Sequence, residues 1–566
     1  MKKILYASSC LALVFLTGCQ KGDFLDKTSV SDLTEENVFS DSTRTMDFLA
    51  GIYTDIGFSF RPSRFGTGGL DAASDEAEGK SLSLGTDYVK FITGSLTAAN
   101  VSPAAWSLPY TNIRRANLFL KHIDKAPFNA TQRATARGEA RFLRAWYYFI
   151  LLKHYGGVPL VGDTLYNLND DIVTKRNTYE ECVNYILSEC DAAAGDLPAE
   201  HFSLDYGRIT KGACMALKSR VLLYAASPLF NGGGLASDPE LKAVTGYPSN
   251  DPERWRLAAE AAKAIMDAEF YELYEDNDTA PGYGFAKVFT LRKNSEYILA
   301  EMMPKNRYLE GLWLPPSRGN PLGAFPTQEL VDAFGMANGL PITDPASGYQ
   351  ADNPYADRDP RLDYTVVRNE SRLLLWETSQ KELVYTYAGA SPDGLGGNGT
   401  STGYYVNKML DEAVTNHIFT SSFRCLPLIR YAEILLNFAE ARNEYSGPDP
   451  DVYEAVEAIR KRAGLDPYTL PAGLSKEAMR RIIRNERRVE LAFEEHRFWD
   501  VRRWLIAEET DDKPVHGMQI TRHEDNSYSY QTFIVRERRF RPPMYLWPIP
   551  QSEIVKSDDM LQNPGW

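Results

Sequence analysis

One helical segment restricts the fold of this chain more than any other part of the sequence. Residues 131–155 follow a helical pattern, and the stretch 142–152 within it is apolar almost all round. Gly156 and Gly157, followed by Pro159, are typical of a helix end. A helix without a polar face has to be buried between other helices. The segment therefore predicts a scaffold made largely of packed helices.

The rest of the chain contains the helices that this burial requires. Helical patterns are expected at residues 34–53, 106–123, 179–194, 211–226, 252–268, 428–445, 452–463 and 476–504. Helix pairs joined by short loops and rich in Ala suggest tetratricopeptide-like stacking, although the repeats are too degenerate to fix a period. Strand-like runs are few, at residues 286–291, 297–303, 364–368 and 383–387. The predicted fold class is mainly α, with long loops and a few short strands.

The N-terminus reads as an export signal. Lys2 and Lys3 precede a mostly apolar run at residues 4–16, and the sequence Leu-Thr-Gly-Cys then ends at Cys19. The run is too short to span a bilayer as a stable helix, which favours a secretory signal. Its ending resembles a bacterial lipoprotein lipobox, in which the Cys is acylated. We expect a signal peptide at residues 1–18 and a lipid on Cys19; an ordinary signal peptide with a stray Cys is the alternative.

Composition excludes some classes of function. The formal charge of −14 excludes a nucleic-acid binder driven by overall charge, because counterion release needs clustered Lys and Arg. Seven His and six Cys leave little material for a transition-metal site, and Cys182 and Cys190 are expected to be buried as small apolar residues. Residues 276–278 could contribute to a calcium site, but the remainder of an EF-hand loop is absent. We expect no cofactor.

Catalytic motifs are weak throughout. Residues 394–399 fit the GxGxxG pattern, but no helix follows them. Residues 399–403 fit GxSxG, but they lie in the same Gly-rich loop and not on a strand-to-helix elbow. Four carboxylates could include a pair for glycoside hydrolysis, although spacing in sequence does not establish spacing in space: Asp71, Asp75, Glu76 and Glu78. The protein is not expected to be an enzyme, and a glycoside hydrolase is a remote alternative.

Two long loop regions carry the residue types that bind sugars. Aromatic rings cover the C–H faces of a glycan, while Asp, Asn, Arg and Lys bind its hydroxyls. The candidate ligand-binding residues are Arg61, Arg64, Phe65, Asp71, Glu76, Lys80, Tyr88 and Asn100 in the first region and Arg307, Tyr308 and Trp313 in the second. Structural alternatives remain open: Trp313 suits the core as well as a ligand platform, and Asp75 with Glu76 could instead order the local loop.

A series of motifs runs in order along the chain. They are EARFLRA (139–145), YGGVPL (155–160), GRITKG (207–212), RDPR (358–361), LIRYAE (428–433), IRNERRVELA (483–492), LWPIP (546–550) and QNPGW (562–566). Together they resemble the SusD/RagB family, the surface lipoproteins of Bacteroidetes nutrient-uptake systems. Arg144 and Arg430 lie in apolar helices within these motifs and must find partners there. We assign the motifs to fold maintenance and not to the ligand.

The resemblance implies a fold, a function and a partner. It implies a SusD-like fold with an N-terminal helical region at 19–230, which carries a ligand loop, and a C-terminal region at 231–566, intertwined as one globular unit. It implies a lipid-anchored protein exposed on the outer membrane, which captures a glycan and delivers it to a SusC-like TonB-dependent transporter. A peptide-binding, RagB-like member of the same uptake system is the alternative.

Overall fold

The computed structural model describes residues 34–566 except 59–63, 81–82, 233, 320–322, 376, 413 and 415–420. The signal peptide at 1–18, the lipidation of Cys19 and the role of Arg61 in ligand binding lie outside the described residues and stay predictions. No described helix is both long enough and apolar enough to cross a membrane.

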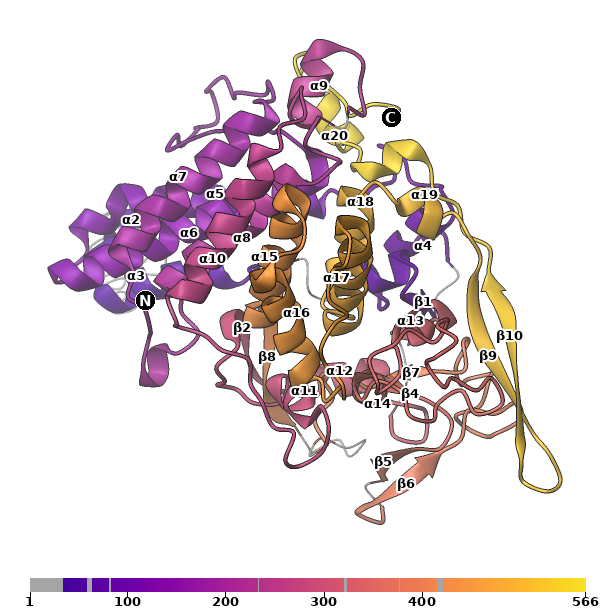
Figure 1. The fold of residues 1–566 in the computed structure, drawn as a ribbon. Coiled ribbons are helices and arrows are strands. Elements are labelled where there is room, and N and C mark those ends of the chain that lie inside the picture. Colours follow the sequence, from indigo (N-terminus) through magenta and orange to yellow (C-terminus); the bar gives the residue numbers. More distant parts are fainter. Residues whose placement is uncertain are drawn as a thin grey trace, which may run out of the picture.

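The N-terminal half forms a row of packed helices (Figure 1). α5, α6, α7, α8 and α10 pack against one another in chain order, and α10 then packs on α15 of the C-terminal half. This arrangement confirms the prediction of a mainly α fold built on stacked helix pairs. The helices are α2 Glu35–Phe39, α3 Ser42–Tyr53, α4 Asp87–Ile92, α5 Ala104–His122, α6 Ala130–Tyr155, α7 Tyr179–Asp196, α8 Lys211–Ala226, α9 Pro239–Thr245 and α10 Glu253–Asp267.

Local sequence explains the limits of α6, the helix with the apolar stretch. Asn129 caps its start in a capping box with Gln132. Its end lies at Gly156, whose φ of 80° lies in the left-handed region, where a side chain would be strained. Residues 142–152 are buried, with α5 and α7 packed on the helix, as the sequence predicts. Cys182 and Cys190 on α7 are buried and unbridged, which confirms their expected role.

The C-terminal half adds a second group of helices. They are α11 Tyr283–Val288, α12 Tyr308–Trp313, α13 Gln328–Ala333, α14 Arg361–Thr365, α15 Tyr431–Ser446, α16 Pro450–Arg462, α17 Lys476–Glu490, α18 His496–Arg503, α19 Ala507–Thr510 and α20 Gln551–Ile554. The helix expected over residues 476–504 is interrupted between α17 and α18. Phe493 and Glu495 there have φ of 58° and 63°, a left-handed conformation that a continuous helix excludes.

Strands form antiparallel pairs at the edges of the helical mass (Figure 1). The pairs are β1 Ala77–Gly79 with β3 Ala324–Pro326, β2 Tyr297–Asn306 with β8 Ser422–Arg430, β4 Val366–Val367 with β7 Tyr405–Val406, β5 Ser371–Leu375 with β6 Gln380–Val384, and β9 Val515–Arg522 with β10 Tyr528–Arg536. The strand expected at 286–291 is wrong, because part of it lies in α11. The buried residues Phe285, Val288 and Phe289 are spaced i, i+3 and i+4, which is a helical period.

Buried arginines form ion pairs within each group of helices. Arg430 pairs with Glu490 at 2.7 Å and with Glu494 at 2.7 Å, and all three side chains are buried. Arg144 on α6 pairs with Glu189 on α7 at 2.7 Å. The expectation that these motif arginines find partners inside the fold is confirmed.

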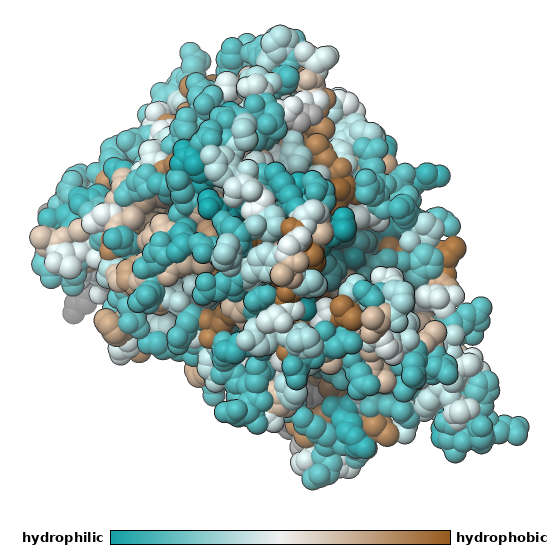
Figure 2. Space-filling view, viewed as in Figure 1, coloured by the Kyte–Doolittle hydropathy of each residue, from teal (hydrophilic) through white to brown (hydrophobic). Residues whose placement is uncertain are grey.

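Figure 2 shows a surface on which apolar residues lie in small groups separated by polar ones.

Candidate ligand-binding surface

The first predicted loop region is largely interior. Phe65, Asp71, Glu76 and Tyr88 are buried. The ring of Phe65 meets Trp547 edge-on at 5.4 Å. Tyr88 lies so close to Gly79 that a Cβ there would come within 2.2 Å of the tyrosine ring. Burial gives these four side chains structural contacts in this conformation, and ligand contact by them stays a prediction.

Asp75 and Glu76 connect this loop to the C-terminal helices. Asp75 forms ion pairs with Arg497 at 2.7 Å and with Arg488 at 2.9 Å. The Glu76 carboxylate lies 3.6 Å from the guanidinium of Arg488 and has no hydrogen-bond partner among the described residues. This placement agrees with the alternative interpretation, in which the two residues order the loop.

The pKa values of these carboxyl groups diverge because their neighbours differ. Burial raises the pKa of Asp71 to about 7 and that of Glu76 to about 8, although nearby cations oppose both shifts. Burial also disfavours the ionised form of Asp75, but Arg488 and Arg497 outweigh it and hold the Asp75 pKa well below its usual range. The fold thus strongly favours an ionised Asp75, whereas Glu76 is largely protonated at neutral pH.

Other predicted residues reach the surface. Lys80 and Asn100 are exposed, and Arg64 is partly exposed with its guanidinium 4.3 Å from the Phe58 ring. Asn100 closes a local turn, since its amide donates to the Ser95 carbonyl at 2.9 Å.

The second predicted region is divided in the same way. Arg307 and Tyr308 are partly exposed at the start of α12, whereas Trp313 at its end is buried, 6.1 Å from the Phe493 ring. In this structure Trp313 therefore packs in the core and does not form a ligand platform. The pairing of β1 with β3 does bring the two predicted regions together, with Ala77 opposite Pro326.

A different surface gathers aromatic side chains from separate parts of the chain. Tyr528 and Tyr530 are two residues apart on β10 and so share one face of the strand. Tyr385 and Tyr387 follow β6 with the same spacing, and Tyr355 comes from the loop before α14. All five are half-buried. We call this set the tyrosine stripe.

Ring contacts order the stripe. The centroids of Tyr385 and Tyr387 are 5.7 Å apart, and those of Tyr387 and Tyr528 are 6.1 Å apart. Tyr355 and Tyr530 form a further edge-on pair at 5.8 Å. Aromatic pairs in this range stabilise each other by about 0.5–1.5 kcal/mol. Each ring is thus held by a neighbour while part of it stays accessible.

Charged and polar groups border the rings. The Arg368 guanidinium lies 5.0 Å from the Tyr355 ring, and that of Arg522 lies 5.7 Å from Tyr387. The Tyr528 hydroxyl donates to the Glu370 carboxylate at 2.9 Å. Burial raises the pKa of Tyr528, so this hydroxyl stays protonated at neutral pH.

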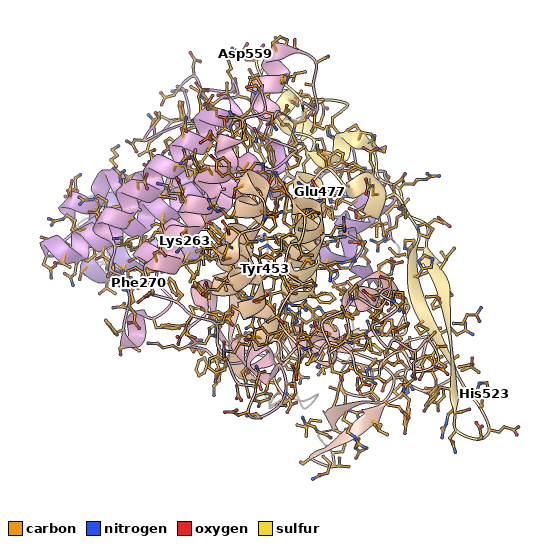
Figure 3. The ribbon with its side chains drawn as sticks, viewed as in Figure 1. Lys263, Phe270, Tyr453, Glu477, His523 and Asp559 are labelled. Carbon is orange, nitrogen blue, oxygen red and sulfur yellow. The ribbon has the colours of Figure 1, made fainter. Side chains whose placement is uncertain are left out.

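The stripe lies where the β9–β10 hairpin meets the loops around β5 and β6 (Figure 1). Figure 3 shows the hairpin reaching away from the helices, with His523 at its far end. Sequence reasoning missed this surface because its residues come from segments about 140 positions apart. The one local signal was the Tyr-x-Tyr spacing, which occurs at 385–387 and again at 528–530.

The stripe offers flat apolar faces with hydrogen-bonding groups at their edges. That combination suits a ring with C–H faces and peripheral hydroxyls. Among the described residues, no group of three or more His, Cys, Asp or Glu side chains could hold a metal ion.

The fold defines a class of protein, a helical-repeat scaffold that carries long loops and β-hairpins. A family model described as the SusD family matches residues 285–566, and one described as starch-binding associating with outer membrane matches residues 23–223. The chain belongs to the SusD-like family.

Relatives match along nearly the whole chain. The SusD-like protein P38 of Formosa agariphila is 24% identical over 525 residues, covering 90% of this chain and 92% of the relative. A crystal structure of a SusD-like protein from Bacteroides fragilis has a TM-score of 0.76 and 28% identity, covering 94% of this chain and 98% of that one. A laminarin-binding SusD-like protein has a TM-score of 0.64 and 21% identity, covering 93% and 100%.

Proposed function

We propose that this protein binds a glycan at the cell surface and does not cleave it. The tyrosine stripe carries the proposal, because it presents pre-ordered ring faces beside Arg368, Glu370 and Arg522. The family description as starch-binding and the laminarin-binding neighbour support a glycan as the ligand. A solvated aromatic surface of this kind typically binds in the micromolar to millimolar range, about −8 to −4 kcal/mol.

Anchoring and delivery form the second part of the proposal. The protein is tethered to the outer membrane through acylated Cys19 and passes its glycan to a SusC-like TonB-dependent transporter. The lipobox-like N-terminus and the family's described association with the outer membrane support this part. Weak binding suits such a role, because the cargo has to be released.

The acidic loop residues argue for binding without hydrolysis. A glycosidase needs two carboxyl groups on either side of an accessible glycosidic bond. Asp71, Asp75 and Glu76 are buried, and Asp75 is held in ion pairs. Glu78 is also buried and pairs with Arg538 at 3.2 Å.

The test is calorimetric titration of soluble polysaccharides, laminarin among them, into wild-type protein and into the variants Tyr387→Ala and Tyr528→Ala. Each substitution removes one ring face and is expected to weaken binding about tenfold, or ~1.4 kcal/mol. Tyr468→Ala removes an exposed tyrosine from the loop after α16 and serves as the matched control. Unchanged affinity in both stripe variants would contradict the assignment of the site. Binding of peptides alone, or release of shortened glycan, would contradict the function.

A further inference from the structure

A cavity lies at the other end of the molecule from the tyrosine stripe. It has a volume of about 1280 Å³ and is formed by the first half of α5, by residues 159–174 and by residues 553–560 around α20. We call it the α5 cleft. Figure 3 labels Asp559, which precedes the lining residue Met560 in the chain and lies far from His523 on the hairpin. Ligand pockets usually measure about 300–1,000 Å³, so the cleft has room for several sugar rings.

Aromatic rings form one wall of the α5 cleft. Trp106 is only 5% exposed and is held between Tyr110 at 5.3 Å and Tyr155 at 5.2 Å. Tyr110 is fixed in turn, because its hydroxyl donates to the Pro159 carbonyl at 2.9 Å. Tyr166 adds a half-buried ring from the opposite segment, whose backbone carbonyl accepts from Arg114 at 2.8 Å.

The contacts of Trp106 leave one polar group unused. They are ring contacts, and its Nε1–H group donates to no acceptor among the described residues. This nitrogen is accessible to solvent, unlike those of Trp313, Trp499 and Trp547, which are buried without a hydrogen-bond partner. Because Trp106 lines the cleft, an acceptor on a bound molecule could supply that partner.

The opposite rim mixes exposed apolar side chains, those of Leu168, Ile172 and Val173, with polar ones, and it is nearly balanced in charge. Asn167 and Asn169 contribute exposed amides. Two cationic residues, Arg114 and Lys556, line the cleft together with three carboxylates, those of Asp170, Asp171 and Glu553. Lys556 forms an ion pair with Glu553 at 2.7 Å. A lining of rings, apolar side chains and amides without a strong electric field favours a neutral ligand with apolar C–H faces and hydroxyls over a charged one.

We propose that the α5 cleft is a second carbohydrate site, which binds a short neutral oligosaccharide independently of the tyrosine stripe. The inference rests on the proposed glycan-binding function. Bound sugar stacks on Tyr166 and accepts a hydrogen bond from Trp106 Nε1–H. Two separate sites on one chain would raise the avidity for a long polysaccharide through a high effective concentration at the second site.

The test uses a hexasaccharide prepared from the polysaccharide that the wild-type protein binds. A background variant, Tyr387→Ala with Tyr528→Ala, removes the ring pair that joins β10 to the segment after β6 and so disrupts the stripe. In this background the hexasaccharide is expected to bind with a stoichiometry near one and to shift the NMR signal of the Trp106 indole N–H. That signal is assigned by its loss in Trp106→Phe, which keeps an aromatic ring in the core.

Adding Tyr166→Ala and Asn169→Ala to the background is expected to weaken this residual binding at least tenfold, while Tyr468→Ala leaves it unchanged. Both replaced side chains lie on the loop and not in the core, so the variant should fold. Unchanged residual binding, or an unmoved Trp106 signal at saturation, overturns the second site while leaving the proposed function in place. If the wild-type protein binds no polysaccharide, both proposals fail. If the cleft variant lost binding to a protein partner but kept its binding of the hexasaccharide, the cleft would be a docking surface and the inference would be overturned.

Discussion

Two buried carboxyl groups make the stability of this protein fall as pH rises through the neutral range. The pKa of Glu76 is raised to about 8 by burial, so the folded state holds a proton that an unfolded chain releases near its ordinary value. Asp71, with a pKa of about 7, acts in the same direction. The contribution of each group is therefore complete at low pH and is lost as pH rises through the folded pKa.

The variant Glu76→Gln keeps the shape of this side chain without its charge. It is expected to flatten the fall in unfolding free energy between about pH 5 and pH 8, a fall on the order of 1 kcal/mol for each unit of pKa difference. Calorimetric melting at a series of pH values measures this. Parallel profiles for the variant and wild type would show that Glu76 is already ionised in the folded protein.

Arg430 illustrates the cost of breaking a buried ion pair. Replacing it with Met leaves Glu490 and Glu494 without that partner in the interior, and we expect a loss of about 3–5 kcal/mol in urea unfolding. Arg256→Met is the control, because its partners Glu253 and Glu260 are exposed, and removal of a surface pair usually changes stability by less than about 1 kcal/mol. Equal effects would mean that the buried network contributes no more than a surface one.

At the scale of elements, the end of α6 depends on one glycine. Gly156 has a φ of 80°, and a Cβ there would lie 2.5 Å from the Val244 carbonyl oxygen. Gly156→Ala is expected to cost about 1–3 kcal/mol and to lower the melting temperature.

Gly195 near the end of α7 provides the opposite case. It lies in a helix with nothing within 4 Å of an added Cβ, so Gly195→Ala should be neutral or stabilising by up to about 1 kcal/mol. If the two variants melt alike, backbone conformation does not limit the α6 terminus.

At the scale of the whole molecule, the predicted lipid on Cys19 decides where the folded body is held. Cys19→Ser removes the acceptor thiol and is expected to shift the protein from the outer-membrane fraction to the soluble fraction, with loss of labelling by palmitate. Cys10→Ala, inside the apolar run, should leave both unchanged. Retention of the Cys19→Ser protein in the membrane fraction would indicate another means of attachment.

Local periodicity was enough to predict most helices. α6 and α8 lie where the sequence predicts them, because a 3.6-residue pattern with end signals is carried by neighbouring residues. The motif arginines could also be assigned to the interior, since a buried charge requires a partner, although Arg430 ends strand β8 and does not lie in the expected helix. The interruption between α17 and α18 was missed. Ion pairs that connect the two helices across it, such as Arg487 with Asp500, cannot be recognised from a helical periodicity.

The exposure of the candidate ligand-binding residues could not be predicted from local sequence. Phe65, Tyr88 and Trp313 have the composition of a sugar-binding loop, yet packing against distant rings such as Trp547 and Phe493 places them inside. The tyrosine stripe arises only when the β9–β10 hairpin meets the loops around β6. Helices follow from contacts between near neighbours in the chain. The exposure of a side chain depends instead on segments hundreds of residues away, and no local pattern in the sequence identifies the segment that will cover it.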